Sequence, residues 1–131
     1  MRLAIVALLV LLAAPAHASA IRIDLNKANQ AKAPLKFTVT TGTASGFVTI
    51  KLQVPRKQPP LAHLWRVDIM LRDGKKTVLA APLATKVVGD TLEAELLLDP
   101  GSMKDAEIWI RTGEHAPLAE TIYAVDIGSF K

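Results

Sequence analysis

The residues best suited to hold a metal ion are two histidines and a glutamate. Beyond residue 20 the chain has only His63 and His115, contains no cysteine, and places Glu114 beside His115. A zinc site takes four nitrogen, sulfur or carboxylate ligands. The alternative hypothesis is therefore a small metal-handling protein that uses His63, His115, Glu114 and further carboxylates. The leading hypothesis is a binding domain, and it includes no cofactor.

The sequence contains no pattern typical of a catalytic nucleophile, a catalytic pair of carboxylates or a phosphate-binding loop. None of the serines beyond residue 20 lies in a G-x-S-x-G turn. Glu93 and Glu95 alternate with apolar residues, as the polar face of one strand does, and do not resemble a catalytic pair. The stretch TGTASG at 41–46 lacks the lysine and the following helix of a phosphate-binding loop. We therefore expect a protein that is not an enzyme.

Trp109 is the aromatic residue with the clearest potential to bind a partner. It lies between Glu107 and Arg111 and out of phase with Ile108 and Ile110, so alternation places it on the polar side of a strand. An exposed indole can stack on a sugar ring or anchor a protein partner. The competing interpretation is that Trp109 covers a cross-strand neighbour, as aromatic residues in sheets often do.

The stretch VPRKQPPLAHLW at 54–65 combines three prolines, two adjacent cations, a histidine and a tryptophan. Pro55 follows an apolar alternating segment, and the next such segment begins at Trp65. Residues 56–64 are therefore predicted to form a stiff cationic loop between two core strands, and loops at the end of a scaffold often carry binding residues. The predicted partner-binding residues are Trp109, Arg56, Lys57, His63 and Arg111.

Short alternating segments dominate the rest of the chain and predict half-buried strands. Asp73-Gly74 and Gly89-Asp90 predict tight hairpin turns, and Pro82 predicts an edge strand or a strand end. Trp65 shares the phase of the apolar residues that follow it and is predicted to lie in the core. Segment 91–98 contains helix-forming residues, but its strict alternation favours a strand.

Seven to eight short strands, no long helix and about 100 residues are typical of a β-sandwich of the immunoglobulin or fibronectin III kind. The sequence therefore predicts an all-β fold in one domain, residues 21–131, without the disulfide common in such folds. Within it, residues 21–35 are predicted to be a loosely attached N-terminal strand and connector. No named family is suggested by any motif.

The first twenty residues are predicted to be a signal peptide. Arg2 precedes twelve apolar residues at 3–14, and small-x-small sites end at Ala18 and Ala20, of which we favour cleavage after Ala20. A mature membrane anchor needs about 20 apolar residues, so no integral membrane segment is expected after cleavage. The absence of cysteine fits bacterial export better than animal secretion. The expected location is the periplasm or the medium.

Charge is distributed unevenly along the chain. Residues 21–86 contain twelve Lys and Arg against three Asp and Glu, and residues 87–131 contain three against nine. Such blocks either steer an anionic partner to one surface or interleave and pair across strands. The cations lack interleaved aromatic residues, so nucleic acid is not an expected partner. The leading hypothesis is an exported, non-catalytic domain that binds an envelope protein or anionic polymer, with its oligomeric state left open.

Overall fold

The computed structural model describes residues 19–115 and 117–130, and within these ranges nine strands form two sheets. The strands are β1 (Ser19–Leu25), β2 (Thr38–Ala44), β3 (Phe47–Pro55), β4 (Leu64–Asp73), β5 (Lys76–Pro82), β6 (Thr85–Val88), β7 (Thr91–Leu98), β8 (Ala106–Thr112) and β9 (Ala119–Asp126). The short 3₁₀ helices are η2 (Gln30–Lys32), η3 (Pro59–His63), η4 (Pro100–Asp105) and η5 (Ile127–Phe130). None of the helices in the described ranges has the length and apolar character needed to cross a membrane.

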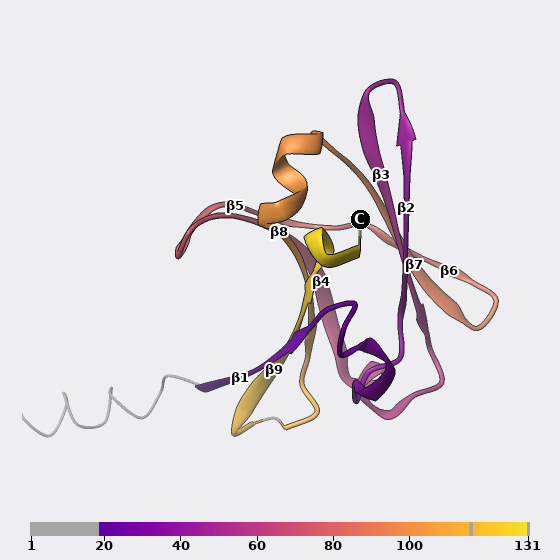
Figure 1. Cartoon of the computed structure of the whole chain (residues 1–131). Coiled ribbons are helices and arrows are strands. Elements are labelled where there is room, and N and C mark those ends of the chain that lie inside the picture. The colour runs from indigo at the N-terminus through magenta and orange to yellow at the C-terminus, as the bar shows by residue number, and fades with distance from the viewer. Residues whose placement is uncertain (1–18, 116, 131) are drawn as a thin grey trace, which may run out of the picture.

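The two sheets confirm the predicted all-β sandwich. One is five-stranded, in the order β1-β9-β8-β4-β5, and the other is four-stranded, in the order β2-β3-β7-β6 (Figure 1). Neighbouring strands are antiparallel except for β1 and β9, which are parallel. The described residues contain one or two strands more than the sequence predicts, partly because the segment between Pro82 and Gly89 forms the short strand β6.

Alternation along the strands builds the core between the sheets. Ile50, Leu52 and Val54 of β3 are each 1% exposed, and Ile108 and Ile110 of β8 are fully buried. Burying one such side chain contributes about 1.5–3 kcal/mol. Segment 91–98 is a strand, as its alternation predicts, because its apolar residues pair in register with those of β3 on the same face.

Hairpin turns with glycine form where the sequence predicts them, one with a shift. Gly89-Asp90 joins β6 to β7 as predicted. Asp73 pairs with Lys76, so the turn between β4 and β5 is Gly74-Lys75, one residue later than predicted. Gly74 and Gly89 have φ values of +61° and +60°, which side chains other than glycine rarely adopt. These turns fix the register of both hairpins.

Trp65 is not a core residue, and this prediction is wrong. Its side chain is 57% exposed. Leu64 pairs with Thr112 and Arg66 pairs with Arg111, which leaves Trp65 as an extra residue in β4 without a partner on β8. Such a bulge re-aims the side chain. The alternation that places Val67 and Ile69 inside therefore does not extend back to Trp65.

The N-terminal part of the described chain is paired along its length. β1 is in register with β9 from Ser19 opposite Ala119 to Leu25 opposite Val125. Leu25, at the end of β1, and Leu35, in the segment that follows η2, are both buried in the core. Residues 1–18 of the predicted signal peptide lie outside the described residues, whereas its last two residues, 19 and 20, begin β1.

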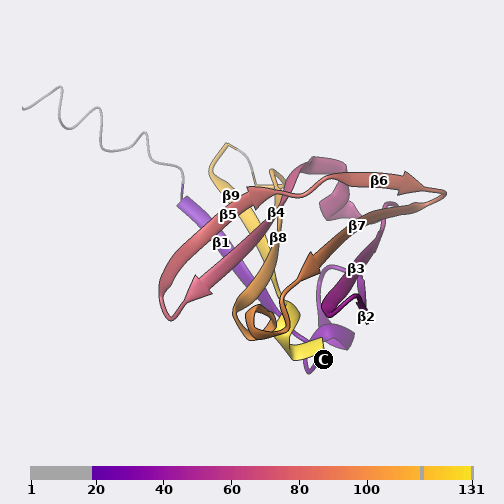
Figure 2. The same cartoon turned by 90° about the horizontal axis from the view of Figure 1, so that it is seen from above.

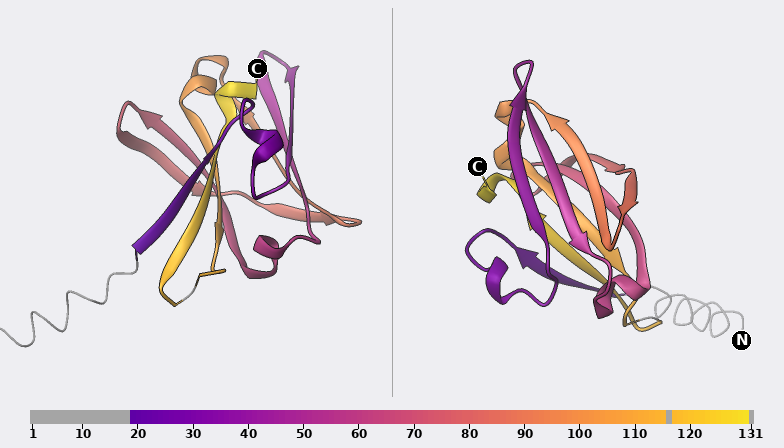
Figure 3. Two further views of the ribbon diagram at one scale, coloured as in Figure 1. Left: turned by 60° about the horizontal axis from the view of Figure 1, so that its bottom comes forward. Right: turned by 90° about the vertical axis from the view of Figure 1, so that its right-hand side faces the viewer.

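The sheets cross, so that the β4–β5 and β6–β7 hairpins project to opposite sides of the molecule (Figures 1 and 2). The β3–β4 loop, which contains η3, and the β8–β9 loop lie together at one end (Figure 3). We call this the loop end. The β2–β3 hairpin points the opposite way.

Candidate partner-binding surfaces

Trp109 lies on the outer face of the five-stranded sheet, where it is half-buried. Its register partner on β9 is Ala124, which is only 1% exposed although it faces outward. The Cζ atoms of Arg22 and Arg111 lie 5.4 and 5.8 Å from the indole centroid, within the range of cation–π attraction. The indole Nε1 donates to Glu107 at 3.3 Å. These contacts favour the interpretation that Trp109 covers its neighbour and joins β1 to β8.

Ion pairs surround Trp109 on the same face. Arg111 donates to both carboxylate oxygens of Glu120, at 2.5 and 3.2 Å, and to Asp68 Oδ2 at 3.1 Å. The hydrogen bond that Arg111 donates to Glu120 is the main cause that raises the pKa of Arg111 above its usual value. Asp68 is 3% exposed and also accepts from Arg66 at 3.0 Å. Its other oxygen, Oδ1, has no hydrogen-bond partner among the described residues. The carboxylates thus lie beneath the guanidinium groups that cover them.

Replacing Trp109 by alanine is expected to lower the free energy of unfolding by about 2–3 kcal/mol. The variant uncovers Ala124 and removes the contacts with Arg22 and Arg111, and the loss is below that of a fully buried tryptophan because the indole is partly exposed. Urea unfolding followed by circular dichroism measures the change. Trp65→Ala is the matched control and should change stability by less than about 1 kcal/mol. If Trp109→Ala and the wild type unfold at the same urea concentration, Trp109 does not stabilise the fold by packing.

The two charge blocks of the sequence interleave in space. Most ion pairs join them, among them Arg22–Glu107 at 2.7 Å, Lys51–Glu93 at 3.6 Å and Lys57–Asp90 at 3.6 Å. In each sheet a strand from the first part of the chain lies beside one from the second, as β1 does beside β9 and β3 beside β7, which brings their charges together. The uneven charge along the chain therefore does not produce one basic and one acidic surface. The cations can therefore bind an anionic partner only at particular sites and not over a whole face.

The β3–β4 loop is fixed at both of its ends. The backbone N–H of Arg56 donates to the carbonyl of Asp90 at 2.8 Å, which ties the loop to the β6–β7 hairpin. The N–H of Gly113 donates to the carbonyl of His63 at 2.8 Å, which ties it to the β8–β9 loop. Prolines and a 3₁₀ turn lie between these points. The loop is therefore fixed at both ends, and its prolines restrict the backbone between them.

A pocket of about 480 Å³ lies between this loop and the β6–β7 hairpin. Leu92 pairs with Val54 on one side and Val87 on the other, so Val87 shares the inner face of the four-stranded sheet. It is nevertheless 55% exposed, because the hairpin projects past the five-stranded sheet. We call this the end pocket. Its apolar wall is Leu61, Leu64, Val87 and Leu92, and its polar lining is Arg56, Lys57 and Asp90.

Trp65 adjoins this end of the molecule and is the residue that sequence reasoning misplaced. A Cβ atom on Gly113 would lie 2.5 Å from Trp65 Nε1, so the indole rests directly on the backbone of the β8–β9 loop. The next side chain, Arg66, is 58% exposed. The two consecutive apolar residues Leu64 and Trp65 at the strand start are the signal in the sequence that alternation breaks there.

The structure separates the predicted binding residues into two places. Arg56 and Lys57 line the end pocket, and His63 is the last residue of η3 beside it. Trp109 and Arg111 lie on the outer face of the five-stranded sheet. Arg56 and Lys57 therefore share one surface, and the two strand residues do not line it.

The residues of the alternative metal site do not gather. Among the described residues, no group of three histidine, cysteine or acidic side chains is placed to hold a metal ion. Glu114 instead accepts hydrogen bonds from the Tyr123 hydroxyl and from Thr112 Oγ1, the latter at 3.2 Å. These bonds hold its carboxylate against the core residue Tyr123. The geometry gives no specific support to the metal hypothesis.

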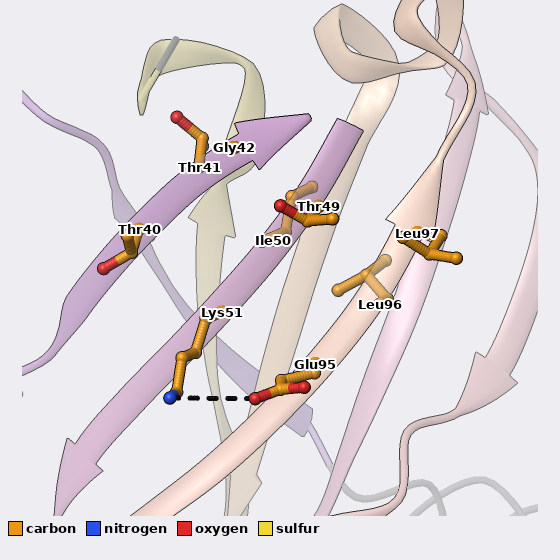
Figure 4. Close-up of a pocket in the computed structure, with 9 residues that line it drawn as sticks. All are labelled: Thr40, Thr41, Gly42, Thr49, Ile50, Lys51, Glu95, Leu96 and Leu97. Atoms are coloured by element: carbon orange, nitrogen blue, oxygen red, sulfur yellow. Dashed lines mark ion pairs between the residues drawn. The ribbon is translucent and has the colours of Figure 1, made fainter. Parts of the chain in front are cut away.

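A second pocket, of about 410 Å³, is a shallow trough on the four-stranded sheet (Figure 4). Gly42 contributes to its floor, and a Cβ atom there would lie 2.8 Å from Thr49 Oγ1. At one end Lys51 and Glu95 neutralise each other across 3.7 Å. Lys51 is the one cation among the described residues that line the trough and it is paired, whereas the end pocket has Arg56 in addition to its Lys57–Asp90 pair, so the trough offers an anionic ligand less.

Next to this trough, Glu93 is only 6% exposed although it lies on an outer face. Gln53 Nε2 donates to its carboxylate at 2.8 Å, and this bond, with Lys51 and Lys86 nearby, holds the pKa of Glu93 below its usual value. The carboxylate is thus fixed in its charged form as part of the sheet.

No protein-family model matches this chain, and no curated protein matches it either.

Proposed function

We propose that the chain is an exported, non-catalytic β-sandwich domain that binds a protein or anionic polymer of the bacterial envelope at its loop end. The single observation that carries the proposal is the end pocket, with its apolar wall and the cations Arg56 and Lys57 on its lining. Binding sites are typically concave and mostly apolar, with a few polar groups that set orientation. Trp65, an exposed tryptophan that follows the pocket residue Leu64 in the chain, is of the residue type most frequent in binding hot spots.

The strand order supports an immunoglobulin kind of sandwich. From β2 onward the chain places β2-β3-β7-β6 in one sheet and β5-β4-β8-β9 in the other. This is the order of strands A-B-E-D and C′-C-F-G in immunoglobulin domains. In that correspondence the β3–β4 and β8–β9 loops are the B–C and F–G loops, which variable domains use for binding. The signal peptide predicted at 1–20 and the absence of cysteine support export and a periplasmic or secreted location.

Capture from a bacterial envelope extract should depend on the end pocket. The immobilised mature domain is expected to retain a partner that mass spectrometry or carbohydrate analysis identifies. Trp65→Ala and the double variant Arg56→Glu/Lys57→Glu should each reduce its capture by about tenfold or more, since hot-spot truncations cost about 1.4 kcal/mol or more. Raised salt should weaken capture further if the partner is anionic.

Matched variants outside the pocket distinguish loss of specific capture from loss of nonspecific binding. Leu97→Ala removes an aliphatic side chain that is 59% exposed on the other sheet. Lys32→Glu and Lys36→Glu together make the same charge change outside the pocket. Both controls should capture as the wild type does. Equal loss in the controls and in the pocket variants would contradict the proposal.

A further inference from the structure

β5 is the free edge of the five-stranded sheet, and no other described strand lies against its outer side. Six of its seven residues are exposed. In Figure 2, β5 and β6 follow each other along one side of the molecule. An open edge of this kind presents unpaired N–H and C=O groups that a further strand can bind. Pro82 ends β5, as the sequence predicts for an edge strand.

The register identifies which backbone groups face outward. The N–H of Leu83 donates to the carbonyl of Val67 at 2.8 Å, which makes these two residues a hydrogen-bonded pair. Hydrogen-bonded and non-hydrogen-bonded pairs alternate along an antiparallel ladder. Ala81, paired with Ile69, therefore bonds to β4. Ala80, one residue earlier, directs its N–H and C=O away from β4 to the open edge.

Apart from Thr77, the side chains of β5 are apolar or cationic. Val78 and Leu79 are 59% and 45% exposed. Residues 74–89 contain Lys75, Lys76 and Lys86 and no acidic residue. Within the described ranges neither Lys75 nor Lys76 has an ion-pair partner, whereas most other cations near the sheets do. Asp73 of β4 is the register partner of Lys76, but the two form no ion pair in the described structure, so the edge keeps a net positive charge beside exposed aliphatic groups.

We infer that β5 is a second binding site, which accepts an extended acidic segment of a partner protein as an added strand. The backbone of Ala80 supplies hydrogen bonds to the added strand, Val78 and Leu79 contact its apolar side chains, and Lys75 and Lys76 pair with its carboxylates. A second copy of this chain would bring the same lysines to the edge, so charge complementarity favours an acidic partner. The site is distinct from the end pocket and does not depend on it.

A labelled peptide tests this site directly. The probe is a fluorescein-labelled heptapeptide of alternating glutamate and valine, titrated with the mature domain at low salt and read by fluorescence anisotropy. The wild type should bind it saturably, and the lysine–valine counterpart should bind at least about tenfold more weakly. On binding, the amide of Ala80 should exchange its hydrogen more slowly.

Two variants should remove this binding for different reasons. Ala80→Pro deletes the outward donor, and proline is tolerated at edge positions whose N–H faces solvent. Lys75→Glu/Lys76→Glu reverses the charge and tests the site even if the proline variant fails to fold. Each should weaken binding of the acidic peptide at least about tenfold. Thr43→Pro, on the edge strand of the other sheet, and Lys32→Glu should leave the affinity within about twofold.

Three results would overturn the inference. One is no binding of the acidic peptide by the wild type, in which case the lysines and proline only protect the edge from aggregation. Another is equal affinity in the wild type and both edge variants. The third is a wild-type dimer in sedimentation that Ala80→Pro dissociates. That result would show that a second copy of this chain occupies the edge of β5. The Trp65→Ala variant should bind the peptide normally, so failure of the end pocket remains a separate result.

Discussion

Replacing Arg111 by methionine is expected to lower the free energy of unfolding by about 3 kcal/mol, because breaking a buried pair leaves an uncompensated charge. Arg111 is the residue that joins Asp68 to Glu120, and the side chains of all three are at most 21% exposed. Without it, Asp68 keeps only Arg66, whose side chain is 58% exposed. Methionine preserves much of the apolar contact with Trp109, so the loss reports the charges. Urea unfolding measures it.

Two further variants make the cause of this loss specific. Asp68→Asn in the Arg111→Met background removes the uncompensated charge and should restore about 1 kcal/mol or more. Arg66→Met removes the exposed member of the same network and should cost no more than about 1 kcal/mol, as exposed ion pairs usually do. If Arg111→Met and Arg66→Met unfold at the same urea concentration, Arg111 is not the residue that stabilises this face.

Local alternation was sufficient to predict most of the fold. In β3 and β7 a residue's place in the alternation determines its face, because each strand pairs in unbroken register with its neighbours. Trp65 escaped prediction because a bulge depends on how two distant strands pair and not on the strand's own pattern. The sequence pattern at 121–130 also continues past Asp126, where β9 ends.

The end of β9 shows why some boundaries depend on tertiary packing. After Asp126 the chain turns into η5, and a Cβ atom on Gly128 would lie 2.8 Å from the carbonyl oxygen of Met103. The glycine thus allows two backbone segments to approach closely. That approach involves a residue 25 positions earlier in the chain, so no local pattern could indicate it.

The candidate site could be predicted only in part. Proline and cation content identified the loop that carries Arg56 and Lys57, and both residues line the end pocket. The pocket itself exists because the β6–β7 hairpin extends past the other sheet and uncovers Val87. That depends on the crossing of two sheets, which strand patterns do not encode. For the same reason the sequence could not show whether its charge blocks form separate surfaces.

Tyr123 is expected to form no phenolate at pH 11 while the domain stays folded, although a free tyrosine is about nine-tenths ionised there. The residue is 2% exposed, and burial, followed by its hydrogen bond to Glu114, raises the pKa of Tyr123 far above its usual range. Tyr123 is the only tyrosine of the chain. Absorbance at 295 nm therefore reports this one hydroxyl, and circular dichroism at each pH reports the fold.

The sign of the linkage gives a second observable. A pKa that is raised in the folded state stabilises the fold at pH values below the unfolded pKa, near 10, and this stabilisation is lost as pH rises above it. The free energy of unfolding should therefore fall by up to about 1.4 kcal/mol per pH unit more steeply than in Tyr123→Phe, which has no phenol to ionise. Glu114→Gln removes the neighbouring charge but not the burial, so its phenolate should form at a lower pH than that of the wild type and still above pH 10. A wild-type phenolate half formed near pH 10 with the native circular dichroism intact would show that Tyr123 is open to solvent, and would contradict the buried contact with Glu114.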